Sequence, residues 1–305
     1  MAVARILRIY LEKAEVARAR AGNYNMMNRI KAAFVGRGFR VEFVQNTPQQ
    51  RLKSATRNGY SLFFMEDPFH ARALNLRLAY YFPYWRIEET AERWAFDVAL
   101  KDYDSARLET NFAHEWANRW RGFLFKGKAA KPVRDGIVYV PLQGRLLERR
   151  SFQQAAPIEM IEHVLEQDQG RKILLGLHPK ETYSDREIAA LETVLAKNPR
   201  LSIIRGNMEE ALRVCDYVVS ENSAAALSGM FFGKPAILFA KVDFHHIALN
   251  VADLGVSDAF AQVEAHRPDF DTYLHWFIAL NSIKADAAEA EVQILEAVRR
   301  HGWQV

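Results

Sequence analysis

The chain has 305 residues, a length that suits one large or two medium domains. Half of the residues are hydrophobic and 26% are charged, which is typical of a globular protein and excludes a largely disordered one. The sequence has no apolar run long enough to span a bilayer, and its first twenty residues lack the features of a signal peptide, so we expect a cytoplasmic protein. The single cysteine, Cys215, excludes an internal disulfide, and its apolar neighbours predict a small buried residue.

The net charge of +4 is unevenly distributed along the chain. Residues 1–134 hold 24 Lys and Arg against 13 Asp and Glu, whereas the remainder holds 17 against 24. A basic half joined to an acidic half indicates two surfaces with different partners. The basic half could meet an anionic acceptor or a membrane surface, or it could consist of solvated helix faces. No nucleic-acid-binding motif is recognisable, and we expect no nucleic-acid partner.

Strand and helix patterns alternate through the first half. Strands are predicted at 5–11, 39–44 and 60–65, an amphipathic helix at 26–34 and a basic helix at 48–57. This alternation is typical of a parallel sheet covered by helices. An aromatic segment at 80–85 fits either a strand or a loop lining a cleft, and we favour core packing over sugar stacking for it. A helical region rich in Trp and Phe is predicted at 88–125.

A short basic segment with a proline, 126–134, reads as a linker. We therefore predict a first α/β domain at 1–131, a second at 132–268, and C-terminal helices at 269–305 that return across the seam. Strands are predicted in the second domain at 136–141, 172–177, 201–204, 217–219 and 236–239, and helices at 157–167, 185–196 and 208–214. Ser184 and Glu187 form a capping box for the helix at 185–196.

The fold prediction is two Rossmann-like α/β domains that face each other across a cleft. The sequence contains neither the G-x-G-x-x-G fingerprint nor a Walker A lysine motif. This argues against a standard dinucleotide enzyme and against a P-loop NTPase.

Polar residues follow three predicted strands of the second domain. They are Gln143-Gly144-Arg145, His178-Pro179-Lys180 and Ser220-Glu221-Asn222-Ser223. Because parallel strands end at one edge of the sheet, we expect these residues to lie close together. A helix that begins near Ala224 presents free N–H groups there, which favour an anion. The pattern predicts a phosphate or pyrophosphate site to which His178 donates, and an ordinary βαβ unit with Ser223 as helix cap is the alternative.

Three segments of this half carry a family resemblance. VYVPLQ at 138–143, LGLHPK at 175–180 and ENSAAALSGMFFGKPAILF at 221–239 together resemble the capsule polysaccharide biosynthesis family of GT-B-like bacterial glycosyltransferases, which are similar to Kdo and sialic acid transferases. The resemblance covers about 136–251. It implies that His178 contacts the phosphate of a CMP-activated sugar and that Ser223, beside Asn222, contacts the nucleotide. Ser228 departs from the Glu that is usual in the family.

The resemblance also assigns roles in the first domain. Related enzymes carry an acidic-acidic-Gly motif after a strand, and its Asp is the catalytic base. Here Glu66-Asp67-Pro68-Phe69 follows the strand predicted at 60–65, with Pro68 in place of Gly. Asp67 is therefore the candidate base with Glu66 second, and a turn carboxylate before Pro68 is the alternative.

Four further residues of the first domain are candidates for binding the acceptor. Asn23 and Tyr24 follow the first predicted strand and would face the same cleft. His70 and Arg72 could meet an anionic acceptor.

Together these features predict a metal-independent inverting glycosyltransferase that uses a nucleotide sugar, such as CMP-Kdo or CMP-sialic acid, to build a bacterial capsule or surface polysaccharide. We expect no cofactor beyond the donor itself, and a glycan or lipid-linked acceptor at the inner face of the membrane or in a capsule-assembly complex. Asp243, His245 and His246 could ligate a metal, but their spacing is loose and we predict no metal. A nucleotide-sugar epimerase and a non-catalytic GT-B-like protein that binds a glycan or a partner are the alternatives.

Overall fold

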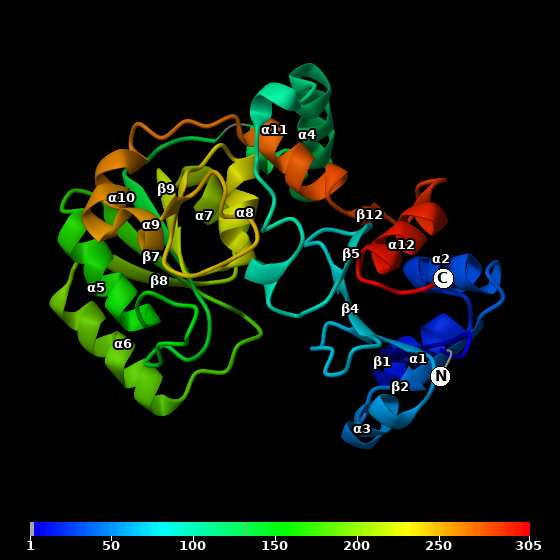
Figure 1. The fold of residues 1–305 in the computed structure, drawn as a ribbon. Coiled ribbons are helices and arrows are strands. Elements are labelled where there is room, and N and C mark those ends of the chain that lie inside the picture. Colours follow the sequence, from blue (N-terminus) through cyan, green and yellow to red (C-terminus); the bar gives the residue numbers. More distant parts are fainter. Residues whose placement is uncertain (1–2, 131) are drawn as a thin grey trace. The chain divides into compact units, whose positions relative to one another are not determined.

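The computed structural model describes residues 3–130 and 132–305 (Figure 1). Its contacts divide the chain into two compact units, one of Met1–Lys101 with Phe277–Val305 and one of Asp102–Trp276. The predicted boundary at 131–132 falls on a residue outside the described ranges. The contacts place the division after Lys101 instead, and they assign most of the C-terminal segment to the first unit.

The first unit contains a six-stranded sheet in the order β12-β5-β4-β3-β1-β2. Strands β1 to β4 are parallel, β5 is antiparallel to β4, and β12 is antiparallel to β5. The elements are β1 (Ile6–Leu11), α1 (Lys13–Arg20), α2 (Asn25–Val35), β2 (Arg40–Gln45), α3 (Pro48–Thr56), β3 (Tyr60–Phe64), β4 (Ala73–Leu78), β5 (Tyr84–Glu88), η1 (Arg93–Ala95), β12 (Ile283–Lys284) and α12 (Ala290–Arg300).

One face of this sheet is covered by α2 and α12, which lie side by side in Figure 1. Met27, Ile30 and Phe34 recur at helical spacing on α2 and are fully buried against the strands. On the opposite face Tyr10 of β1 stacks on Phe63 of β3, with ring centroids 4.6 Å apart. The strands predicted at 5–11, 39–44 and 60–65 and both predicted helices are thus confirmed, whereas α1 and β4 were not predicted.

The aromatic segment at 80–85 divides between core and surface. Tyr84 and Trp85 begin β5 and are buried, whereas Phe82 lies in the preceding turn and is 56% exposed. The helical region predicted at 88–125 is wrong in its first part, because a regular helix begins only at Thr110. The side chain of Asp104 accepts a hydrogen bond from the Ala106 N–H and so competes with helix formation in this stretch.

The second unit contains a six-stranded sheet, entirely parallel, in the order β11-β10-β9-β6-β7-β8. Both units are therefore α/β, as predicted. The elements are η2 (Ser105–Arg107), α4 (Thr110–Phe125), η3 (Lys128–Ala130), β6 (Ile137–Leu142), α5 (Pro157–Gln167), β7 (Lys172–Leu177), α6 (Asp185–Lys197), β8 (Leu201–Arg205), α7 (Met208–Val214), β9 (Tyr217–Ser220), α8 (Ala224–Phe231), β10 (Ala236–Leu238), β11 (Leu249–Asn250), α9 (Val251–Leu254), α10 (Val256–Val263) and α11 (Phe270–Leu274).

Apolar residues from α5, α6 and α10 cover one face of this sheet, and α7 and α8 cover the other. Both faces are buried, which is why β6, β7 and β9 read as almost continuous apolar runs. The capping box of α6 is confirmed, because the Glu187 carboxylate accepts from the Ser184 N–H at 2.8 Å. Cys215 is fully buried, as predicted.

The C-terminal segment is less helical than predicted. After α11 the chain forms a turn of π-helix, η4 (His275–Leu280), then the short strand β12, and only then the long helix α12. Pairing of Ile283 with Trp85 and of Lys284 with Tyr84 adds β12 to the sheet of the first unit. None of the helices in the described ranges is both long and apolar enough to cross a membrane.

Candidate functional site

A cavity of about 500 Å³ lies at the carboxyl edge of the second unit's sheet. Its lining comes from the ends of β6 and β7, the turn that follows β8, and the first residues of α8. In parallel α/β sheets this edge is where ligands bind, because the strands deliver loops and helix N-termini to one place. The structure therefore places a concave site where the sequence clusters predicted one.

His178 follows β7 directly, is exposed, and lines this cavity together with Pro179. The Lys180 N–H lies 3.3 Å from His178 Nδ1, which therefore accepts, and the neutral ring carries its proton on Nε2. The Tyr183 hydroxyl accepts from the His178 backbone N–H at 2.9 Å and holds the turn. This arrangement leaves an imidazole N–H to donate to an anionic oxygen.

Tyr139 forms the floor of the cavity, and Gly176 makes room for it. A Cβ at Gly176 would lie 2.6 Å from the Tyr139 hydroxyl oxygen, far inside van der Waals contact. Only a glycine on β7 allows the neighbouring ring of β6 to lie across it. Burial raises the pKa of the Tyr139 phenol, which therefore stays protonated at neutral pH.

The start of α8 closes another side of the cavity. Ser223 is the helix cap, and its Oγ accepts from the Ala225 N–H at 3.2 Å. Ser220 Oγ in turn accepts from the Ser223 N–H at 3.2 Å. Ser228, one turn further along the helix, is buried and also lines the cavity. The positive end of the helix dipole and these hydroxyl groups suit a phosphate group.

Several lining residues were not predicted. Gly206 and Asn207 both adopt left-handed backbone conformations, with φ of 74° and 52°, and turn the chain from β8 into α7. The Gly-Asn pair after a strand is the sequence signal that could have found this turn. Lys128 and Glu209 meet at the rim, where Nζ and Oε2 lie 2.7 Å apart.

Other predicted nucleotide-binding residues lie outside the lining of the cavity, namely Gln143, Gly144, Arg145, Lys180, Glu221 and Asn222. Their roles in binding stay predictions. Arg145 is well exposed and lies 3.6 Å from Glu148. A Cβ at Gly144 would lie 2.7 Å from Glu181 Oε2, so this glycine permits a close approach of two loops.

Glu221 belongs to a buried polar network. Its carboxylate accepts from the side-chain amide of Gln153, and Arg150 Nη2 lies 3.4 Å away. Burial raises the pKa of Glu221 to about 7, against the opposing effect of Arg150. Asn222 is also buried. Both residues therefore form a buried part of the bend that leads from β9 to Ser223.

In the first unit the predicted catalytic acids already have partners. Glu66 forms an ion pair with Arg51, and the Asp67 carboxylate accepts from the Ala91 N–H at 2.8 Å. Asp67 is exposed on the loop after β3, whereas the Glu66 carboxylate is partly covered. The catalytic assignment of both stays a prediction.

The four predicted acceptor residues also make structural contacts. The Arg72 guanidinium donates to backbone carbonyls at the end of α3 and in the turn after it, those of Ala55, Arg57 and Gly59. His70 Nε2 lies 3.1 Å from Ser54 Oγ, and burial lowers the pKa of the ring. Asn23 is exposed, and its backbone N–H donates to Arg18. Tyr24 is buried beneath the Arg18 guanidinium, and burial raises its pKa to about 12.

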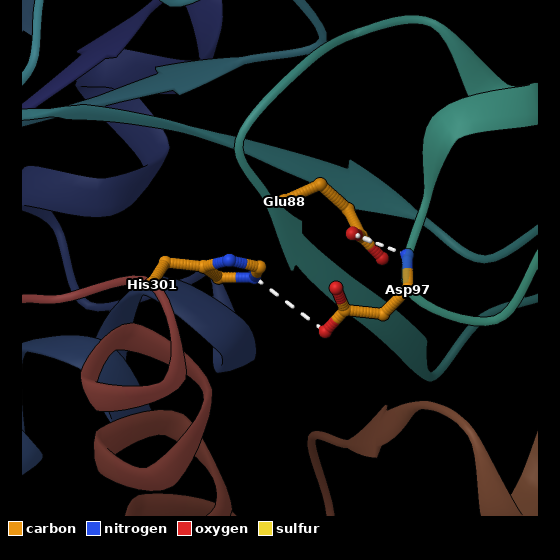
Figure 2. A group of neighbouring side chains, drawn as sticks. All are labelled: Glu88, Asp97 and His301. Carbon is orange, nitrogen blue, oxygen red and sulfur yellow. Dashed lines mark hydrogen bonds and ion pairs between the residues drawn. The ribbon is translucent and has the colours of Figure 1, made fainter. Parts of the chain in front are cut away.

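The described residues contain one group with the composition of a metal site, Glu88, Asp97 and His301 of the first unit, whose ligand atoms lie within 4.8 Å of one another (Figure 2). His301 Nε2 lies 3.0 Å from the carbonyl oxygen of Ile87 and therefore donates its proton there. Asp97 pairs with Arg300 at 2.9 Å, and its N–H donates to Glu88. A cation bound here would have to displace the proton on His301 Nε2 and the Arg300 guanidinium from Asp97. We therefore assign no metal to this group.

The residues considered for a metal on sequence grounds lie in the second unit. The rings of His245 and His246 stack, with centroids 4.2 Å apart, and His246 Nδ1 lies 3.1 Å from the Tyr273 hydroxyl. Asp243 is fully buried. These residues make polar and ring contacts within the fold.

No family model matches the chain. Among solved structures, the chain is similar to the beta Kdo 2,7 transferase of KpsC from Thermosulfurimonas dismutans, with a TM-score of 0.53 and 13% sequence identity over 95% of this chain and 99% of that one. It is also similar to the beta Kdo 2,4 transferase of the same KpsC, with a TM-score of 0.47 and 12% identity over 88% and 89% of the two chains. S. aureus MnaA in complex with UDP gives a TM-score of 0.36 and 10% identity over 97% and 96%. The first similarity, together with the two six-stranded α/β sheets, shows a GT-B-type fold.

Proposed function

We propose that the protein is a glycosyltransferase that binds a nucleotide-activated sugar in the cavity of its second unit. The observation that carries this proposal is the convergence of His178, the cap of α8 and the buried Ser228 on one cavity at the carboxyl edge of a parallel sheet. An imidazole N–H and a helix N-terminus are groups that bind phosphate oxygens. The GT-B-type fold supports the same reading by analogy.

In the proposed reaction the acceptor oxygen attacks the anomeric carbon of the donor sugar. The bond from that carbon to the phosphate oxygen breaks, and its electron pair leaves with the phosphate. His178 Nε2–H donates a hydrogen bond to the departing phosphate. The N–H groups at the start of α8 stabilise the negative charge that develops on this phosphate. The acceptor proton passes to a carboxylate, which we assign to Asp67, and the configuration of the sugar inverts.

The donor that we propose is a CMP-activated sugar of the Kdo or sialic acid kind, and the acceptor is a glycan or lipid-linked glycan of a bacterial surface polysaccharide at the inner face of the membrane. The KpsC domain with the similar fold is named as a Kdo transferase. The basic first half of the chain suits an anionic acceptor.

One observation favours a non-catalytic relative that only binds a glycan or a partner. Both acidic candidates are engaged, Glu66 by Arg51 and Asp67 by the Ala91 N–H, and Pro68 follows them. Under that alternative Asp67→Ala leaves function unchanged. Under the transferase proposal the same substitution abolishes transfer and leaves nucleotide binding intact, as a radiolabelled-donor assay would show. An epimerase would instead turn over the donor without an acceptor.

The first test is a thermal-shift panel of CMP, CDP, UDP, GDP and ADP, each with and without EDTA. A ligand present at a hundred times its Kd stabilises the fold by about 2.7 kcal/mol through mass action. We expect a CMP-selective shift that EDTA does not change and that His178→Ala removes. Lys197→Ala is the matched control, because Lys197 is an exposed residue of the same unit, at the end of α6, and lies outside the cavity lining. If no nucleotide shifts the transition, the proposed function is wrong.

A further inference from the structure

The residues that lead from β7 into α6, 178–184, present His178 to the cavity of the second unit. Strand β7 ends at Leu177, and His178 and Pro179 both line the cavity. A proline disfavours the helical conformation in the residue before it, so Pro179 favours an extended backbone at His178. The direction of the imidazole then depends on what holds the rest of this turn.

A single hydroxyl group, that of Tyr183, connects the ends of β6 and β7. It accepts from the backbone N–H of His178 at 2.9 Å and donates to the carbonyl of Leu142, the last residue of β6, at 3.4 Å. Burial raises the pKa of the Tyr183 phenol, which therefore keeps the proton that it donates. Leu142 and His178 both line the cavity, whereas Tyr183 lies outside the lining. The hydroxyl thus acts on the site only through residues that line it.

The Tyr183 side chain is itself fixed by its surroundings. It directly precedes the cap of α6, where Ser184 and Glu187 form the capping box, and its ring packs against the apolar core of the second unit. The second carboxylate oxygen of Glu187 accepts from the Leu146 N–H at 2.5 Å and ties the loop after β6 to the same helix end. The start of α6 therefore holds the loops that follow both strands.

The His178 ring depends on the same turn. Its Nδ1 accepts from the Lys180 N–H at 3.3 Å, which is a long hydrogen bond, and the residue is exposed. Such a bond directs the ring only while the turn that supplies the N–H keeps its shape. The orientation of the imidazole is therefore linked to the hydroxyl of Tyr183 through the backbone of 178–180.

We propose that Tyr183 is a positioning residue for His178, whose hydroxyl fixes the turn that presents the imidazole to the cavity. The inference rests on the proposed function, in which His178 donates to a phosphate of the donor. Tyr183→Phe keeps the ring and its packing but leaves the His178 N–H without its acceptor. The imidazole then has to be ordered when the ligand binds, which lowers the affinity.

The first measurement needs no nucleotide. It follows the ¹³C relaxation of the His178 ring in the full-length protein with labelled histidine, and His178→Ala identifies the signals by their disappearance. We expect an ordered ring in the wild type and a more mobile ring in Tyr183→Phe. Tyr217→Phe is the matched control, because the Tyr217 hydroxyl donates to Asp168 at 2.6 Å but lies at the start of β9, outside the lining. The control should leave the His178 ring ordered.

The second measurement compares CMP with cytidine, which has the same base and ribose but no phosphate, by NMR titration. Tyr183→Phe should weaken CMP binding about three- to tenfold, the range to which the net contribution of one hydrogen bond corresponds. Cytidine binding should not change, because the imidazole acts on the phosphate. A residue that only stabilised the fold would weaken both ligands alike.

Three results would overturn the inference. A ring that is equally ordered in the wild type and in Tyr183→Phe would show that the turn keeps its shape without the hydroxyl. An equal gain of mobility in Tyr217→Phe would indicate a general loss of stability. Equal weakening of CMP and cytidine would show that Tyr183 does not act through His178. If the wild type binds no CMP, the proposed function fails, and the ring relaxation alone decides the role of Tyr183.

Discussion

Each unit has a cavity, and the two cavities are built on different principles although both lie on six-stranded α/β sheets. In the second unit all strands are parallel, and the cavity is lined by strand ends, glycines and small hydroxyl residues. In the first unit two antiparallel strands extend the sheet, and the cavity beside them is lined by long charged side chains. The parallel sheet surrounds its cavity with strand ends and a helix N-terminus, whereas the antiparallel edge surrounds its cavity with side chains brought from distant segments.

The close contact between Gly176 and Tyr139 at the cavity of the second unit gives the largest expected effect. Gly176→Ala places a Cβ 2.6 Å from the Tyr139 hydroxyl oxygen and 2.8 Å from a ring carbon. The buried ring has to shift, so we expect the free energy of unfolding to fall by about 1–3 kcal/mol and CMP binding to weaken. Urea unfolding followed by circular dichroism measures the first effect, and calorimetric titration with CMP the second.

The matched control for that change is Gly170→Ala in the same unit. Gly170 is exposed, and a Cβ there would have no neighbour within 4 Å. We expect a change in unfolding free energy of less than about 0.5 kcal/mol. Equal effects of the two substitutions would contradict the role given to Gly176.

A buried glutamate in each unit offers a comparison by pH. Burial raises the pKa of Glu88 in the first unit and of Glu221 in the second to about 7, from ordinary values near 4.5. The folded state then binds more protons than the unfolded state between these values, so the contribution of each group to stability is full below pH 4.5 and is lost as the pH rises to about 7. Replacing either residue by Gln removes this loss.

The unfolding free energy of the wild type should therefore fall between pH 5 and pH 8. We expect this fall to be smaller by about 1–2 kcal/mol in Glu88→Gln and in Glu221→Gln. Urea midpoints at the two pH values measure this. Asp97, Arg86 and Arg300 surround Glu88, whereas Arg150 and Gln153 face Glu221. A wild-type protein whose stability is the same at both pH values would show that neither carboxyl group is held neutral.

The helix caps give the smallest expected effect and separate stability from binding. Ser223 caps α8 at the cavity, and Ser184 caps α6 outside its lining. Each Ser→Ala substitution should lower the unfolding free energy by about 1 kcal/mol. Only Ser223→Ala should also weaken CMP binding in the calorimetric titration. If both variants lost CMP binding, the loss would follow from lower overall stability and would not indicate a contact between Ser223 and the nucleotide.

The sequence predicted the elements of the second unit well because their signals are local. Apolar runs mark β6, β7 and β9, and the helical spacing of apolar residues marks α5. The capping box of Ser184 and Glu187 lies within one helical turn. His178, Pro179 and Ser223 could be placed at one edge because parallel strands end together.

Tertiary structure alone decided how the first unit is completed and what lies at its edge. Strand β12 is two residues long and has no pattern of its own, and it exists because Ile283 and Lys284 pair with a strand about two hundred positions earlier. The meeting of Glu88, Asp97 and His301 likewise joins chain segments that no local spacing relates (Figure 2). Side-chain periodicity and capping act over a few residues and can be read from sequence, whereas long-range pairing depends on which buried surfaces fit together once the chain has collapsed.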